Sequence, residues 1–203
     1  MIPAVIVLGG ETLGMETRDW TDPSFDPSSG PILVRIDTVE LLFNPMDPHP
    51  IQLRDLDVEV SEWITEWAEE QPRRAPIEIT IVVGDDSAHG REDLIIHGIQ
   101  NHFAYRRWAS ARQLSGLFKT GRVSLAIGLI VFGVLTTVTR LIEAPTNSAF
   151  TDLVQEGLTI APWVAMWRPM EIFLYEWWPI RADLRIFDRL ASSTITLARP
   201  TAR

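Results

Sequence analysis

A run of seventeen residues without a charged side chain, Val123 to Thr139, constrains this chain more than any other feature. Arg122 precedes the run and Arg140 follows it. As a helix rising about 1.5 Å per residue, the run covers roughly 26 Å, close to the ~30 Å hydrocarbon core of a bilayer. Leu141 and Ile142 lengthen it if Arg140 extends outward along its aliphatic stem. The sequence therefore predicts a transmembrane helix.

The charges divide the chain into an acidic first part and a basic second part. Residues 1–92 hold 19 acidic and 6 basic side chains, whereas residues 93–203 hold 8 acidic and 12 basic ones. This division predicts an acidic soluble head joined to a basic, apolar membrane part. An acidic head lacks the clustered Lys and Arg that bind nucleic-acid phosphates, so no nucleic-acid partner is expected. The chain has no Cys, which excludes disulfides and Cys-ligated metals.

The head is expected to be an α+β domain with the order strand, strand, helix, strand, helix, and it is assigned to residues 31–92. Apolar residues from Val60 to Trp67 repeat at helical spacing, with Asp55 or Asp57 as the N-cap. Residues 1–30 are expected to form an extended N-terminal arm, because residues 10–30 are rich in Asp, Pro, Ser and Gly. Runs of branched apolar residues predict strands at 3–8, 32–36, 39–43 and 77–83.

The membrane part is expected to be an α-helical transmembrane hairpin over residues 122–180. A basic juxtamembrane helix over 93–121 leads to it, with Gly121 as a hinge, and a basic C-terminal tail over 181–203 follows it. Two interpretations of residues 157–180 stay open: a second transmembrane helix, or a helix that dips into the bilayer and then runs along the interface. We favour the transmembrane helix. Because Lys and Arg cluster before the first helix and after the second, both termini are placed in the cytoplasm.

Several long strings resemble a family of uncharacterised bacterial inner-membrane proteins. They are NHFAYR at 101–106, GRVSLAIGL at 121–129, and WVAMWRPMEIFLYEWWPI at 163–180; in the head, LFNPMDP at 42–48 and RDLD at 54–57 also fit. The resemblance covers roughly residues 39–190. It implies a cytoplasmic α+β head on a two-helix hairpin in the inner membrane, and it implies no activity.

No motif predicts a catalytic residue, a cofactor or a metal. The segment Gly9 to Gly14 lacks the Lys and Ser or Thr of a phosphate-binding loop, and Glu16 follows it. His97 and His102 are five residues apart, which separates them by about 140° on a helix and disfavours a shared metal. The acidic residues of the first helix are interpreted as its cap and its solvent face.

Residues that contact partner helices or lipid are easier to propose. Arg168 and Glu171, one helical turn apart, form a candidate intramembrane ion pair, which we interpret as a lock between the second helix and the first, or a partner, rather than as an ion relay. The candidate helix-packing residues are small: Gly121, Ser124, Gly128 and Gly133. The candidate interfacial, partner or lipid contacts are Trp163, Trp167, Trp177, Trp178, His102, Tyr105, Arg106 and Arg107.

These features favour a non-enzymatic accessory subunit of a larger bacterial membrane complex, of the respiratory or photosynthetic type. Its partners would be other transmembrane subunits and membrane lipids, with the acidic head docked on the cytoplasmic face. A stand-alone membrane enzyme or lipid-headgroup-handling protein that uses Arg168 and Glu171 is the first alternative. A self-associating membrane scaffold or sensor is the second.

Overall fold

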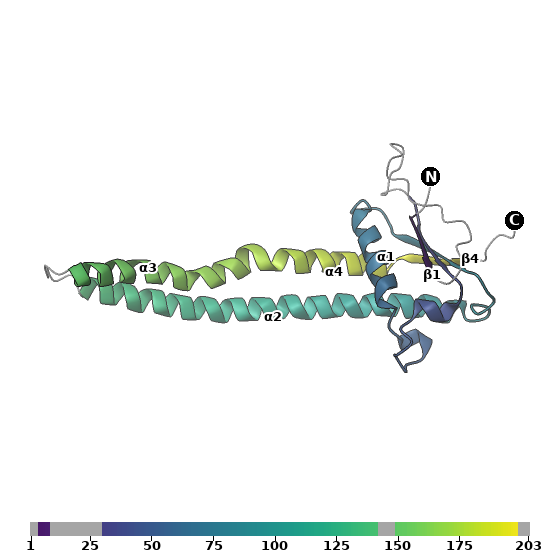
Figure 1. Cartoon of the computed structure of the whole chain (residues 1–203), viewed down its shortest axis with the longest axis horizontal. Helices are drawn as coiled ribbons and strands as arrows, with labels where there is room; N and C mark the ends of the chain where they lie inside the picture. Colours follow the sequence, from purple (N-terminus) through teal and green to yellow (C-terminus); the bar gives the residue numbers. More distant parts are fainter. Residues whose placement is uncertain (1–3, 9–29, 142–148, 199–203) are drawn as a thin grey trace. The chain divides into compact units, whose positions relative to one another are not determined.

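The computed structural model describes residues 4–8, 30–141 and 149–198, which divide into two compact units (Figure 1). The first unit, which we call the head, comprises residues 1–108 and 183–203. The second, which we call the hairpin, comprises residues 109–182. The head is therefore discontinuous in sequence, and the hairpin is an insertion within it.

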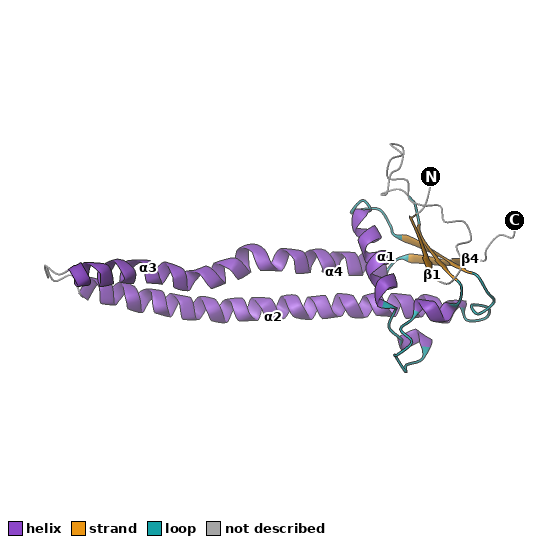
Figure 2. Ribbon diagram, viewed as in Figure 1, coloured by secondary structure: helices purple, strands orange, loops and turns teal. Residues whose placement is uncertain are grey.

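Four parallel strands lie side by side in the order β1-β2-β3-β4 (Figure 2). They are β1 (Ala4–Leu8), β2 (Ile32–Ile36), β3 (Glu78–Val83) and β4 (Thr194–Ala198). Parallel neighbours need crossover connections. The connection from β2 to β3 contains α1 (Val58–Glu70), and the connection from β3 to β4 contains the helices of the hairpin. The predicted α+β class is therefore corrected to a mixed α/β fold with a parallel sheet.

The hairpin connection is helical over most of its length. It consists of α2 (Glu92–Leu141), α3 (Ala149–Glu171), a π-helix (Ile172–Glu176) and α4 (Trp177–Ala191). The predicted hinge at Gly121 is absent, because α2 continues through it. α3 begins at Ala149, and residues 142–148, between α2 and α3, lie outside the described part.

The core of the head lies on one face of the sheet. Ile32, Val34 and Ile36 on β2 alternate with more exposed residues and are fully buried, as strand geometry requires. Asp57 caps α1 by accepting a hydrogen bond from the Glu59 N–H at 2.9 Å, which confirms one of the two predicted caps. The helices contribute Val60 and Ile64 from α1, Ile99 and Phe103 from α2, and Phe187 and Leu190 from α4 to the same core.

The predicted strand at 39–43 is wrong. Residues Val39–Leu42 form a 3-10 helix, and Phe43 makes only an isolated antiparallel bridge to Leu56. The buried members, Val39 and Leu42, are three residues apart, which is the repeat of a 3-10 helix and not of a strand. The Val39 N–H donates to the Ser87 hydroxyl at 3.0 Å, so this turn is tied to the loop after β3 rather than to a neighbouring strand.

The predicted basic C-terminal tail is also wrong. Its residues complete α4 and then form β4, whose Thr194, Ile195 and Thr196 pair with β3. Arg189 donates to the main-chain oxygens of Pro72 and Ala75, each at 3.0 Å, and of Ala68 at 3.4 Å. Burial lowers the pKa of Arg189. Residues 183–198 of the predicted tail therefore belong to the head.

We expect Ile81→Ala to destabilise the head by about 2–5 kcal/mol, because it removes a fully buried side chain from the central strand β3. Thermal and urea unfolding of the purified protein in mild detergent would measure the change. Val58→Ala is the matched control, since Val58 is 62% exposed. Equal effects of the two substitutions would contradict the assigned core.

Candidate functional site

Two glycines of α2 form the contact between the two arms of the hairpin. A Cβ on Gly121 would lie 2.8 Å from Cγ2 of Ile172, and a Cβ on Gly128 would lie 3.1 Å from the carbonyl oxygen of Ala165. Both distances are shorter than ordinary van der Waals contact, so glycine is needed for the helices to approach this closely. The two predicted packing residues Gly121 and Gly128 therefore lie at the helix contact.

The other two predicted packing residues take no comparable part. Ser124 is half-buried, and Gly133 is exposed, with no described heavy atom within 4 Å of where its Cβ would lie. Two prolines of α3, which the sequence analysis did not single out, are buried instead: Pro162 and Pro169. Pro169 lies 3.7 Å from the Cβ position of Gly128. Their seven-residue spacing matches that of the glycines and is the signal that could have found them.

The glycine contacts fix an antiparallel register. Gly121 faces Ile172, and seven residues later Gly128 faces Ala165, seven residues earlier on the other arm. In this register Arg168 lies opposite Leu125, about 4.5 Å along the helix axis from Arg122. The Arg168 charge, predicted near the middle of a membrane helix, therefore lies close to one end of the uncharged run of α2.

Arg168 belongs to a three-member charge cluster. Its Nη1 is 3.1 Å from a carboxylate oxygen of Glu171, and its guanidinium also pairs with both carboxylate oxygens of Glu176. Glu176, which sequence reasoning missed, ends the π-helix, a wider turn that shifts the following side chains around the helix axis. Both partners are on the same arm as Arg168, so these three side chains form a cluster within one arm. The predicted lock to the first helix or to a partner stays a prediction.

The exterior of the hairpin is apolar. Among the described residues, α2 is the one helix long and apolar enough to cross a membrane, and only 11% of its most apolar 18 residues are buried. Trp163, Trp167 and Trp178 are each about two-thirds exposed, as expected for interfacial or partner contacts. Further exposed large apolar side chains include Val123, Ile127, Leu129, Ile130, Val134 and Leu141 on α2 and Leu153, Ile160, Val164, Leu174 and Tyr175 on the other arm.

An aromatic cavity of about 330 Å³ lies between the arms, lined by Leu114, Phe118, Phe173, Trp177 and Arg181. The Phe118 and Phe173 rings stack with centroids 6.2 Å apart. The indole N–H of Trp177 donates to the Phe173 carbonyl at 2.9 Å, and the Arg181 guanidinium lies 5.6 Å from the Trp177 ring centroid. Trp177 is thus half-buried in a cavity wall, whereas Trp178 is exposed.

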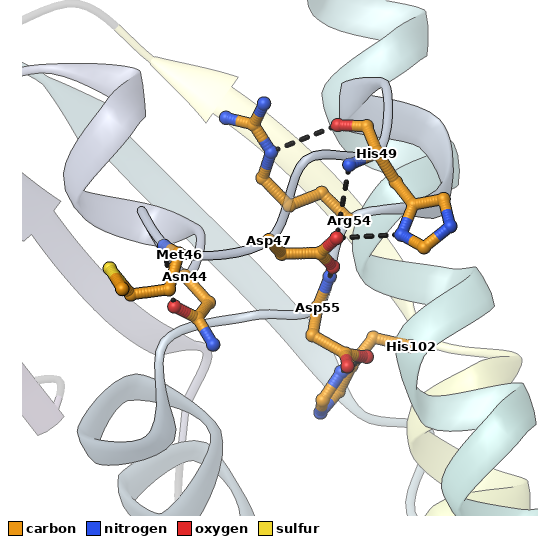
Figure 3. A network of polar contacts seen from close by, with 7 residues as sticks. All are labelled: Asn44, Met46, Asp47, His49, Arg54, Asp55 and His102. Carbon is orange, nitrogen blue, oxygen red and sulfur yellow. Dashed lines mark hydrogen bonds and ion pairs between the residues drawn. The ribbon is translucent and has the colours of Figure 1, made fainter.

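A polar network lies in the head, around the loop that precedes α1 (Figure 3). One Asp47 oxygen accepts from the His49 backbone N–H at 3.0 Å and contacts Nδ1 of the same residue at 2.6 Å; the other accepts from the Asp55 N–H at 2.8 Å. These donors, the Asp55 N–H first, lower the pKa of Asp47 to about 2. Arg54 donates through Nε to the His49 carbonyl at 3.1 Å. The Asp47 side chain is therefore ionised at neutral pH, and its hydrogen bonds connect the backbone at His49 with the backbone at Asp55.

His102 lies between this loop and α1. Its Nε2 is 2.9 Å from the Ser61 hydroxyl, and its Nδ1 is 3.1 Å from an Asp55 oxygen and accepts from the Leu56 N–H at 3.3 Å. Ser, His and Asp are the members of a hydrolytic triad, but Ser61 is 1% exposed and His102 is 8% exposed. A buried hydroxyl cannot meet a substrate, so this arrangement joins α1, α2 and the loop.

The residues near His102 that were predicted to contact lipid make contacts with other residues of the head or line a cavity there. Arg107 Nε is 3.1 Å from Asp188, and the Arg106 guanidinium lies 4.7 Å from the Phe187 ring centroid. Tyr105 is exposed and lines a polar cavity of about 390 Å³, together with Asp47, His49, Leu53, Arg54, Asp55, Asn101 and His102. The structure thus brings Tyr105 and His102 together beside two carboxylates, which are unsuited to an anionic headgroup.

Within the described ranges, no three His, Asp or Glu side chains converge as metal ligands would. Comparison with known proteins gives no match, whether to a family model, a curated protein or a solved structure. The resemblance to a bacterial inner-membrane family therefore stays a prediction.

We expect Gly121→Leu to destabilise the hairpin by about 1–3 kcal/mol, the usual cost of overpacking, because its side chain would meet Ile172. Gly133→Leu is the matched control, since its Cβ position is open, and it should be neutral or slightly stabilising. Thermal unfolding in detergent, followed by circular dichroism, measures both. A neutral Gly121→Leu variant would refute the register.

We also expect a pH dependence from His102. Burial, only partly offset by Asp55, lowers its pKa from the ordinary value of 6.5. The unfolded chain therefore binds the proton at a higher pH than the folded one, and the free energy of unfolding should fall as the pH drops below about 6.5. His102→Gln should flatten this slope in unfolding measurements between pH 5 and 7.5. The exposed His97 supplies the control His97→Gln, which should keep the slope; a slope unchanged in His102→Gln would contradict the assignment.

Proposed function

We propose that this protein is a non-enzymatic accessory subunit of a larger membrane complex in the bacterial inner membrane, of the respiratory or photosynthetic type. In this proposal the hairpin is inserted in the bilayer as two transmembrane arms, and both termini and the head are cytoplasmic. The observation that carries it is the apolar exterior of the hairpin. In water this apolar surface would be exposed to solvent, which is unfavourable, whereas in a membrane lipid or partner helices would cover it.

The positions of the charges support membrane insertion. Between Arg122 and Arg140, α2 has no charged residue over roughly 27 Å. On the facing arm, residues 157–167 are uncharged, and the register places them opposite residues 126–136 of α2. Arg168 extends toward Glu171 and Glu176, away from this uncharged zone. The charges of the two arms thus lie at or near the ends of the same apolar zone, as a bilayer requires.

The two prolines inside α3 also favour a membrane setting. Each removes a backbone hydrogen bond, which costs about 3 kcal/mol or more inside a helix in water. Transmembrane helices carry Pro more often than soluble ones do. In the hairpin Pro162 and Pro169 are buried, and Pro169 packs against the groove left by Gly128. The helix therefore uses them as packing surface.

The exposed aromatic residues favour a subunit over an isolated anchor. Trp163, Trp167 and Tyr175 project from one arm with two-thirds or more of their surface exposed. Large aromatic side chains dominate binding energy at protein interfaces. On the head, α1 presents an exposed acidic face of Glu59, Glu62, Glu66, Glu69 and Glu70, which suits a basic partner surface. The partners in this proposal are therefore transmembrane subunits that carry a basic surface on their cytoplasmic side.

The first alternative, a membrane enzyme or lipid-headgroup-handling protein acting through Arg168 and Glu171, is less well supported. Arg168 already pairs with two carboxylates on its own arm, which leaves little of its guanidinium for a substrate. A self-associating scaffold or sensor would use the same apolar exterior. The three proposals differ in what accompanies the purified protein.

Purification in mild detergent tests the proposal. A tagged chain expressed in its native host should elute with stoichiometric membrane subunits, identified by mass spectrometry. Trp163→Ala combined with Trp167→Ala should reduce the recovered partner about tenfold or more, since each aromatic hot spot contributes about 2 kcal/mol or more. Met46→Ala is the control, because Met46 is an exposed apolar residue of the head. Elution of the chain alone, or only with further copies of itself, would refute the accessory-subunit proposal.

A further inference from the structure

We infer that the aromatic cavity between the two arms binds the phosphate and glycerol end of an anionic phospholipid. This inference rests on the proposed membrane insertion of the hairpin. The cavity holds about 330 Å³ and is lined by Leu114 and Phe118 of α2 and by Phe173, Trp177 and Arg181 of the other arm. All five residues belong to the hairpin.

The chemistry of the walls matches an amphipathic ligand. Four of the five lining side chains are apolar or aromatic, and the fifth is a guanidinium. The Trp177 ring is fixed by its hydrogen bond to the Phe173 carbonyl, and Arg181 lies against that ring at a distance typical of a cation–π contact. A guanidinium held in this way presents its N–H fork to a phosphate, while the aromatic walls cover the glycerol and the first acyl carbons.

The cavity lies at the level expected for headgroups. On α2, Phe118 precedes Arg122 by four residues and Leu114 precedes it by eight, which places them about 6 and 12 Å beyond the start of the uncharged run. The polar headgroup region of a bilayer occupies this depth outside the hydrocarbon core. Tryptophan and arginine are also the side chains typical of this layer.

The surrounding charge selects an anion. No acidic residue occurs on α2 between Asp93 and its end at Leu141. On the facing arm, Glu171 and Glu176 pair with Arg168. Lys119 and Arg122 are both exposed on α2 near the cavity level. A zwitterionic lipid would gain nothing from this excess of positive charge, and a soluble phosphate would leave the aromatic walls uncovered.

Lipid titration of the purified full-length protein tests the inference. Phosphatidylglycerol added to mixed micelles should raise the midpoint temperature of thermal unfolding, and it should do so at a lower mole fraction than phosphatidylcholine does. Arg181→Gln should weaken the apparent phosphatidylglycerol affinity about fivefold, the effect of one basic residue at an anionic surface. Trp177→Leu should weaken it as well, because it removes the ring that holds Arg181. Lys119→Gln is the matched control, an exposed base outside the cavity lining, and should change the affinity less than twofold.

The other outcomes are equally informative. Inorganic phosphate that raises the midpoint as effectively as phosphatidylglycerol would overturn the lipid assignment in favour of a soluble anion. Arg181→Gln that lowers partner recovery without changing lipid affinity would assign the cavity to a protein partner and overturn it too. Flotation with vesicles separates the two levels of the proposal. A protein that floats but shows no dependence on Arg181 refutes this inference alone, whereas a protein that does not float refutes the membrane insertion itself.

Discussion

The contact of Gly121 and Gly128 with the opposite arm is the constraint on which the hairpin depends. Any larger side chain at Gly121 would meet Ile172, so the two backbones approach only because glycine is there. This approach sets the register, and the register decides where every charge of the facing arm lies relative to α2. Without it, Arg168 and Glu171 would have no fixed level along the apolar run. The same contact gives one proline of α3 a packing role, because Pro169 lies against the groove at Gly128.

The head is built from the chain segments on both sides of the hairpin. Both segments that flank it, the start of α2 and the end of α4, contribute to one hydrophobic core through Ile99, Phe103, Phe187 and Leu190. The strand that follows α4 pairs with the strand that precedes α2. The hairpin is therefore closed by sheet hydrogen bonds at its sequence ends, and separating them would require breaking β3 from β4.

Local periodicity predicted the elements whose burial depends on their own sequence, and it failed where partners distant in sequence decide. The strand at 32–36 and the helix capped by Asp57 follow directly from apolar spacing and cap chemistry. The strand β4 was missed because Thr194–Ala198 follows a charged helix and acquires its role only by pairing with β3. Glu176 was missed because a π-helix changes which side chains share a face. The buried contacts of His102 join residues 41 and 47 positions away, and no spacing rule predicts them.

The uncharged segment of the second arm is shorter than the uncharged run of α2. Residues 157–167 cover only about 17 Å as a helix, less than a bilayer core, whereas the run on α2 covers roughly 26 Å. Arg168 makes up part of the difference, because its guanidinium reaches toward Glu176, eight residues further along the chain. The backbone at Arg168 can then lie inside the apolar zone while its charge lies nearer the edge. Under the proposed membrane insertion, the three-charge cluster would bring the charge of Arg168 nearer the end of the apolar zone, so that the second arm could match the depth of α2.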